Sequence, residues 1–155
     1  MHPSRFRVAC LAGAALCVSL AGCGHKSIEA DEFNTRLITF PNGAKVRAEF
    51  VSHPKDVMRG MKYRESLAPD RGMLFQHGQE SYYRYWMYEV RIPLDLIWLD
   101  SHGVIVQLLH SAPPCPGPQE ICPSYGGAFK AIQVLELAAG TAKKNGLKPG
   151  MRLDY

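Results

Sequence analysis

The sequence lacks the short signatures that mark many enzyme active sites. It has no phosphate-binding loop, no glycine-rich dinucleotide fingerprint, no nucleophile elbow and no His-Glu-x-x-His zinc helix. One short match, the Ser-x-x-Lys of Ser52 and Lys55, has no companion motif and coincides with the expected start of a helix. We therefore predict no catalytic residues.

Charge of one sign is also scarce. The formal net charge is +4, and Arg5 and Arg7 of the N-terminal leader described below account for half of it. A residual charge of +2 does not indicate a nucleic-acid partner, because nucleic-acid binding depends on clustered cations.

Clustered metal ligands are missing as well. His53, Met58, Met61, Met73, His77 and Met87 are ligands of the kind that soft metals such as copper prefer. They are scattered, however, and methionines commonly fill apolar cores. We predict no metal site and no cofactor, with soft-metal handling as an alternative. Zinc binding by His110, Cys115 and Cys122 is disfavoured by the spacing of the two cysteines.

The N-terminus has the organisation of a lipoprotein leader. Arg5 and Arg7 precede an apolar run from Val8 to Leu20, interrupted only by Ser19. As a helix this run would span about 20 Å, too short for the roughly 30 Å core of a bilayer. It ends in Leu20-Ala21-Gly22-Cys23, which resembles the lipobox of bacterial lipoprotein signal peptides. We predict a signal peptide over residues 1–22 and lipidation of Cys23.

This leader also predicts the location of the mature protein. Acylated Cys23 would hold the chain to a lipid membrane in the cell envelope, and polar residues 23–34 would form a tether. In Gram-negative bacteria an Asp after the lipidated cysteine resembles a signal for retention in the inner membrane, and this chain has Gly24 there. We therefore expect the periplasmic face of the outer membrane.

Few cysteines remain after processing. Cys10 and Cys17 lie in the leader and Cys23 would be acylated, which leaves Cys115 and Cys122. An even pair in an oxidising compartment predicts a disulfide between them.

Residues 35–155 have the pattern of one β-rich domain. Asn42-Gly43 is typical of a tight hairpin turn, and short helices are expected after Pro54 and from Thr141. The run Leu94–Leu99 is almost continuously apolar, which predicts a strand covered on both faces. We predict a mainly β (α+β) fold, a small antiparallel barrel-like sheet with two short helices. The expected strands are 37–40, 45–50, 73–76, 82–88, 94–100, 104–110, 129–137 and 151–154.

A series of ordered motifs resembles the bacterial and archaeal family called domain of unknown function 192. The motifs are Gly60-Met61 with Arg64, Gly72-Met73-Leu74-Phe75, Trp86-Met87, Ile92-Pro93-Leu94-Asp95, Pro113-Pro114-Cys115, Cys122-Pro123-Ser124-Tyr125 and Leu135-Glu136-Leu137 with Gly140. The resemblance extends from about Val46 to Leu153 and implies a small β-rich domain, often secreted or lipid-anchored, without an established activity. The chain departs from the family pattern at Lys62 and at Tyr88-Glu89, where the family usually has an apolar residue and Lys-Asn.

The aromatic run Tyr82–Tyr88 is the most suggestive surface feature. On a strand, Tyr82, Arg84, Trp86 and Tyr88 would share one face, and Tyr83, Tyr85 and Met87 the other. With one face in the core, the other would offer aromatic rings to a glycan or peptide. Alternatively, loops or a helix cover both faces.

Asp95 interrupts an apolar strand, where an unpaired carboxylate is costly. We expect Arg64 to pair with it, with Trp86 nearby, because a guanidinium stays charged and can grip a carboxylate with two bonds. The alternatives are a carboxylate that caps loop amides and a ligand-binding or catalytic acid.

Together these features favour a cell-envelope lipoprotein of unknown activity, a non-catalytic module that binds a glycan, peptide or protein partner. The ligand-binding candidates are Arg64, Trp86, Tyr88 and Asp95. The alternative is a small envelope hydrolase or transferase using Asp95 with a second acid such as Glu136.

Overall fold

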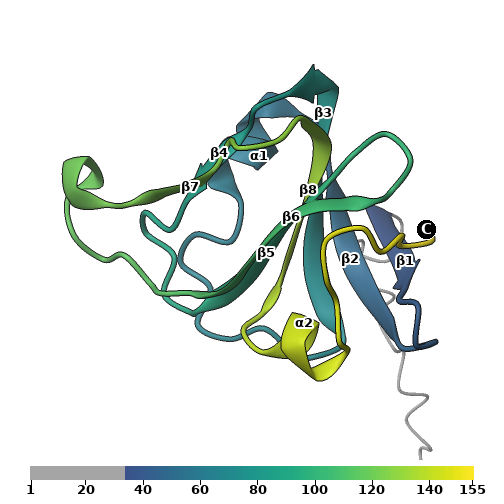
Figure 1. Cartoon of the computed structure of the whole chain (residues 1–155). Coiled ribbons are helices and arrows are strands. Elements are labelled where there is room, and N and C mark those ends of the chain that lie inside the picture. Colours follow the sequence, from purple (N-terminus) through teal and green to yellow (C-terminus); the bar gives the residue numbers. More distant parts are fainter. Residues whose placement is uncertain (1–33) are drawn as a thin grey trace, which may run out of the picture.

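The computed structural model describes residues 34–155 (Figure 1). The predicted signal peptide, the lipidation site Cys23 and the tether up to residue 33 lie outside the described residues. Within the described part of the chain, no helix has the length and apolar character needed to cross a bilayer.

The domain is built on a six-stranded sheet with the order β1-β2-β3-β8-β5-β6, so the predicted mainly β fold is confirmed. A separate two-stranded sheet pairs β4 with β7, and two short α-helices, α1 and α2, and a 3-10 helix over Gln119–Ile121 complete the domain. The strands are β1 (Thr35–Thr39), β2 (Lys45–Val51), β3 (Arg71–Ser81), β4 (Arg84–Trp86), β5 (Leu94–Leu99), β6 (Ile105–Ala112), β7 (Ser124–Gly126) and β8 (Ala131–Ala138). The helices are α1 (Pro54–Arg59) and α2 (Thr141–Lys144).

The main sheet is mixed, whereas the sequence suggested antiparallel pairing throughout. β1 and β2 form the hairpin predicted at Asn42-Gly43, but β2 and β3 pair in parallel. A parallel pair needs a crossover that carries the chain back to its starting edge, and residues 52–70, including α1, supply it.

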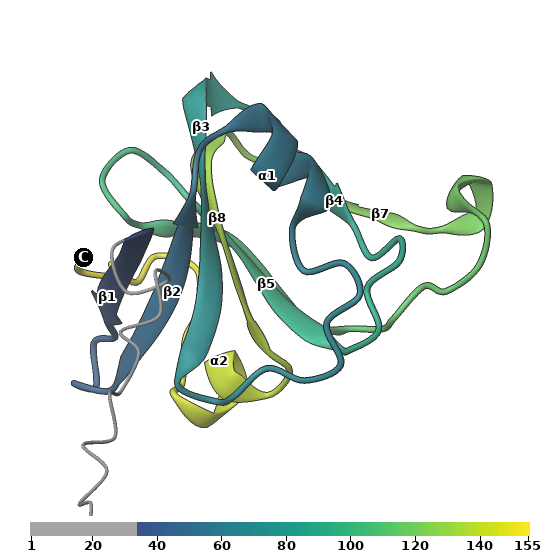
Figure 2. The same cartoon turned by 180° about the vertical axis from the view of Figure 1, so that it is seen from behind.

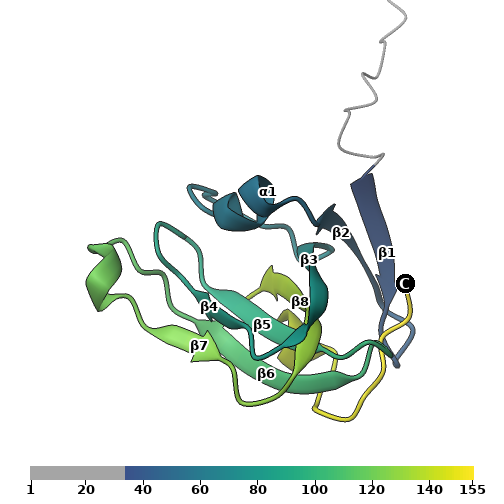
Figure 3. The ribbon, with the colours of Figure 1, turned by 90° about the horizontal axis from the view of Figure 1, so that it is seen from above.

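The sheet curls but does not close into a barrel. Its edge strands β1 and β6 are not paired with each other, and the C-terminal segment lies between them (Figure 3). This segment makes isolated bridges, Thr39 with Asp154 and Val104 with Arg152, instead of the strand predicted over 151–154. The last residues therefore link the two edges without completing a continuous ladder.

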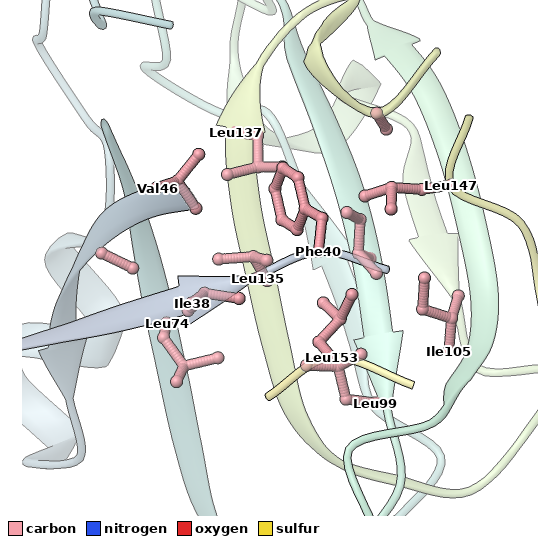
Figure 4. Close-up of a cluster of buried hydrophobic side chains, with 13 residues drawn as sticks. Ile38, Phe40, Val46, Leu74, Leu99, Ile105, Leu135, Leu137, Leu147 and Leu153 are labelled. Atoms are coloured by element: carbon pink, nitrogen blue, oxygen red, sulfur yellow. The ribbon is translucent and has the colours of Figure 1, made fainter. Parts of the chain in front are cut away.

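One core lies on the face of the sheet that α2 and the C-terminal segment cover (Figure 4). Phe40, Leu147 and Leu153 pack there against alternate residues of the central strands. From β5, Ile97 and Leu99 point into this core.

A second core lies on the opposite face, below α1 and the β4-β7 sheet (Figure 2). Leu96 and Trp98 of β5 point into it, because successive residues of a strand face opposite ways. All six residues of Leu94–Leu99 are buried, which confirms the prediction of a strand covered on both faces.

Candidate functional site

A pocket of about 170 Å³ lies between α1 with its following loop, β3 and the segment around β4. We call it the aromatic pocket. Its aromatic lining and its carboxyl group come from Phe75, Tyr83, Tyr85, Trp86, Tyr88 and Glu136. α1 and β4 lie on the same side of the main sheet (Figure 2), so the pocket is on the face that carries the second core.

The alternating pattern of the aromatic run forms the wall of this pocket. β4 is short, and within it Tyr85 packs on the second core whereas Trp86 is 37% exposed. Met87 is fully buried, and the rings of Trp86 and Tyr88 lie 5.7 Å apart. One face of the run is therefore inside and the other reaches solvent, as the sequence indicated. The open alternative, in which both faces are covered, does not apply.

Glu136 is the most unusual side chain of the pocket. It lies in the central strand β8 between β3 and β5, it is 5% exposed, and its Oε2 has no hydrogen-bonding partner among the described residues. Burial raises the pKa of Glu136 to about 8, although the charge of Arg64 acts to lower it. The carboxyl group therefore holds a proton at neutral pH.

The wall beside Glu136 is polar but uncharged. The Nε2 atom of His77 lies 3.0 Å from the hydroxyl of Tyr85, and the His77 ring stacks on Tyr83 with 3.5 Å between centroids. Burial raises the pKa of Tyr85, with a further contribution from Glu136, and burial lowers the pKa of His77. These groups can exchange hydrogen bonds with a ligand without carrying charge.

The residues that depart from the family pattern meet at the rim. Lys62 Nζ lies 3.1 Å from Glu89 Oε2 and 4.8 Å from the centroid of the Tyr88 ring. Hydrogen bonds from Tyr63 and Lys62 lower the pKa of Glu89. The residues that depart from the family pattern are thus neighbours in space, and the positive charge of Lys62 is offset by the negative charge of Glu89.

Arg64 pairs with Glu49 of β2, so the predicted pair with Asp95 is wrong. Its Nη1 and Nη2 atoms lie 2.5 and 2.6 Å from the two carboxylate oxygens of Glu49. Arg64 and Glu49 line a wider hollow of about 710 Å³, which shares Arg59 and Lys62 with the aromatic pocket.

Asp95 belongs to the other face of the sheet, where it caps two backbone amides. It is fully buried, and its two oxygens accept hydrogen bonds from the N–H groups of Ser111 and Ala142 at 2.9 and 2.8 Å. Because Leu96, its neighbour in β5, is the residue paired with Glu136, Asp95 and Glu136 point to opposite faces. The two acids of the predicted hydrolase alternative are therefore separated by the sheet.

The predicted disulfide between Cys115 and Cys122 is present, and it supports the wall of the pocket. The Cys115 N–H donates to the Met87 carbonyl at 3.3 Å, and the Glu89 N–H donates to the Cys115 carbonyl at 3.1 Å. These bonds fix the segment that carries Tyr88.

Three methionines considered as soft-metal ligands, Met61, Met73 and Met87, are core residues as expected. Met58 is 69% exposed, because α1 is a short helix at the rim. Over residues 34–155, no three His, Cys, Asp or Glu side chains are grouped so that they could hold a metal ion.

Of the four ligand-binding candidates, the structure brings Trp86 and Tyr88 together in the aromatic pocket, with Arg64 beside it and Asp95 elsewhere. Sequence reasoning considered Glu136 only as a partner acid and assigned no role to His77 beyond a metal ligand. The signal for Glu136 was available, since it interrupts the apolar run of residues 134–137 as Asp95 interrupts its own strand.

Comparisons with known proteins agree with this fold. A family model for DUF192, described as an uncharacterized ACR, matches residues 37–155. No curated protein matches the chain. A crystal structure from Sinorhizobium meliloti 1021, described as that of a candidate transcription regulator, has 31% identity and a TM-score of 0.68, covering 76% of this chain and 89% of that one. A protein of unknown function from Novosphingobium aromaticivorans DSM 12444 has 24% identity and a TM-score of 0.69, with coverage of 78% and 84%.

Proposed function

This chain belongs to the DUF192 family, and we propose that its domain is a non-catalytic cell-envelope module that binds a glycan in the aromatic pocket. The observation that carries the proposal is a buried carboxyl group in a pocket walled by aromatic rings, whose Oε2 has no hydrogen-bonding partner over residues 34–155. Buried polar groups in proteins are nearly always hydrogen-bonded, and a binding site is a common reason for an exception.

The chemistry of the wall fits a sugar ring. Tyr83, Tyr85 and Trp86 offer flat apolar surface that can pack on the C–H face of a sugar. The Tyr83 hydroxyl donates to the Gln79 carbonyl at 2.7 Å and the Tyr85 hydroxyl lies 3.0 Å from His77 Nε2, so these two tips hold the rings in place. Glu136 adds an uncharged hydrogen-bonding group, which suits the neutral polar groups of a sugar.

The size of the pocket favours one sugar unit over a protein partner. Sites for drug-sized ligands have volumes of roughly 300–1,000 Å³, so about 170 Å³ suits a single ring. A stable protein partner typically buries about 800 Å² on each side, which a pocket of this kind does not provide.

The arrangement supports binding more than hydrolysis. Glycosidases commonly use two carboxyl groups across the scissile bond. Of the described residues that line the pocket, Glu136 alone has a carboxyl group, and Asp95 lies beyond the sheet.

Ligand binding by the exported domain tests the proposal. We expect oligosaccharides from the bacterial envelope to shift NMR signals of the pocket residues, and Trp86→Ala to weaken binding about tenfold, because one wall is lost. Phe129→Ala is the matched control, since Phe129 is 55% exposed and does not line the pocket. Sugar products in the mixture, or equal binding by Trp86→Ala, would contradict the proposal.

A further inference from the structure

We propose that Glu136 makes the pocket selective for 2-acetamido sugars, by donating a hydrogen bond from its protonated carboxyl to the amide carbonyl oxygen of the ligand. The inference rests on the proposed glycan binding and adds the chemical class of the sugar. It starts from the state of the Glu136 side chain in the pocket.

Glu136 has to be a hydrogen-bond donor there. Its Oε2 atom is inaccessible to solvent and unpartnered, which is tolerable for a carbonyl oxygen but costly for half of a carboxylate. The proton then belongs on Oε1, and this oxygen is the one that a ligand in the pocket can meet. A neutral carboxylic acid donates through that hydroxyl, so the ligand must supply an acceptor.

The groups around Glu136 do not supply the hydrogen-bond acceptor that its protonated carboxyl needs. On β5 the residues facing the same core are Leu94, Leu96 and Trp98, which are apolar apart from an indole N–H that donates to the carbonyl of Tyr83. On β3, His77 is engaged with the hydroxyl of Tyr85, the titratable group that β4 places nearest.

The charged side chains that line the pocket beside Glu136 are the cations Arg59 of α1, Lys62 of the loop after α1 and Arg84 of β4, and the charge of Arg64 also acts on Glu136. Lys62 is paired with Glu89, Arg64 with Glu49, and Arg84 donates to the hydroxyl of Ser124 at 3.0 Å. Arg59, whose side chain is exposed, also lines the pocket.

These charges argue for a neutral ligand group. The surrounding cations disfavour an ammonium ligand at the base of the pocket, because like charges in a partly buried site repel. Three of the cations are already committed to protein partners, so an anionic ligand would lose hydration without gaining a free partner at that depth.

Among the neutral groups of envelope sugars, the amide carbonyl is a strong acceptor that needs no donor in return. A hydroxyl group would also bring its own hydrogen, for which the buried Oε2 is out of reach. The acetamido methyl group would find apolar surface on the rings of Phe75 and Tyr85.

Isothermal titration of the exported protein with N-acetylglucosamine, glucose, glucosamine and glucuronate tests the inference. At about pH 7 we expect N-acetylglucosamine to bind about tenfold more tightly than the other three. Between about pH 7 and pH 9.5 this affinity should fall by about tenfold or more, because the donor is lost as Glu136 ionises with its pKa of about 8.

Two variants separate the role of the donor from that of the fold. Glu136→Gln keeps an N–H donor of similar shape, so binding should persist and become independent of pH over this range. Glu136→Leu removes the donor and should lose the preference for N-acetylglucosamine. Glu120→Gln, at an exposed carboxyl outside the pocket, should behave as wild type.

The outcomes separate this inference from the proposed function. A preference for glucosamine or glucuronate, a flat pH profile of the wild type, or a pH-dependent Glu136→Gln would overturn the inference while leaving glycan binding in place. If no sugar or envelope oligosaccharide binds to the wild type, both proposals fail.

Discussion

Two acidic side chains buried in adjacent strands differ in the hydrogen bonds that their carboxyl groups make. Asp95 and Glu136 are both almost completely buried, yet Asp95 accepts hydrogen bonds from two backbone amides and Glu136 Oε2 has no partner among the described residues. Burial of a carboxyl group therefore does not identify a site at the residue scale. The hydrogen bonds around the carboxyl group are more informative. A carboxylate that accepts hydrogen bonds from the protein stabilises the fold, whereas a carboxyl group without such partners can bind a ligand.

We expect Asp95→Asn to destabilise the domain by about 1–3 kcal/mol. An asparagine keeps one acceptor, but its NH₂ group would face a backbone N–H and leave that donor unpaired. The free energy of unfolding of the variant and the wild type, measured by urea denaturation at neutral pH, tests this prediction. Asp154→Asn is the control, because the side chain of Asp154 is 77% exposed; equal stability of the two variants would show that the capping bonds contribute nothing.

Glu136→Gln is expected to stabilise the protein, and by more as the pH rises. The pKa of this carboxyl is about 8 in the folded protein and near 4.5 in the unfolded chain. At a pH between these two pKa values, the folded wild type therefore holds a proton that the unfolded chain has lost. Wild-type stability therefore falls as pH rises through this window, at up to about 1.4 kcal/mol per pH unit, and the total is a few kcal/mol.

Glutamine does not titrate, so the variant escapes this loss. Urea denaturation of both proteins at about pH 5, 6.5 and 8 measures the difference, which should be small at pH 5 and largest at pH 8. A difference that is constant with pH would mean that Glu136 ionises normally in the folded protein.

At the scale of elements, the small β4-β7 sheet packs on the main sheet mainly through Trp98. Trp98 of β5 is fully buried, and its indole N–H donates to the carbonyl of Tyr83 at 2.9 Å. Gly126 of β7 lies directly against the same indole. This contact places β4, and with it Tyr85 and Trp86, over the second core.

Gly126→Ala should therefore be strongly destabilising, by about 3 kcal/mol or more. A Cβ atom at this position would overlap the Trp98 ring, and the backbone φ of +80° is unfavourable for alanine. Gly43→Ala is a matched control, since Gly43 has a φ of +84° and nothing lies within 4 Å of an added Cβ atom. It should lose only about 1 kcal/mol.

Thermal unfolding of both glycine variants, followed by tryptophan fluorescence, separates steric overlap from backbone strain. If the two variants lose the same stability, the packing of Gly126 on Trp98 does not hold the small sheet in place.

At the scale of the whole molecule, the domain is tied down close to where the described chain begins. The side-chain amide of Asn34 donates to the Phe50 carbonyl of β2 at 2.7 Å. If residues 23–34 form the proposed tether, its extended length of about 40 Å would let the aromatic pocket meet envelope glycans away from the membrane surface.

The proposed lipid anchor gives the last prediction. Cys23→Ala should abolish labelling by an alkyne fatty acid and stop processing to the mature form, because the thiol that accepts the lipid is gone. Gel mobility and membrane fractionation of cells expressing each form provide the readout, with Cys17→Ala as the control inside the leader. Unchanged labelling of Cys23→Ala would refute the lipoprotein proposal.

Local pattern was enough to predict much of this fold. Asn42-Gly43 marked the hairpin, the apolar run Leu94–Leu99 marked a strand buried on both faces, and two remaining cysteines predicted the disulfide. Each of these depends on residues close together in the chain or on simple counting, so a sequence can reveal them.

The partners of charged groups were decided by long-range packing. Arg64 was expected to pair with Asp95, but it pairs with Glu49 of β2, the strand that runs parallel to β3. Asp95 instead accepts hydrogen bonds from backbone amides of β6 and α2. Hydrophobic periodicity specifies which face of a strand is buried, but not which strand lies beside it or in which direction it runs. The neutral carboxyl of Glu136 therefore emerged only from the assembled sheet, in which it has apolar neighbours and no hydrogen-bonding partner for Oε2.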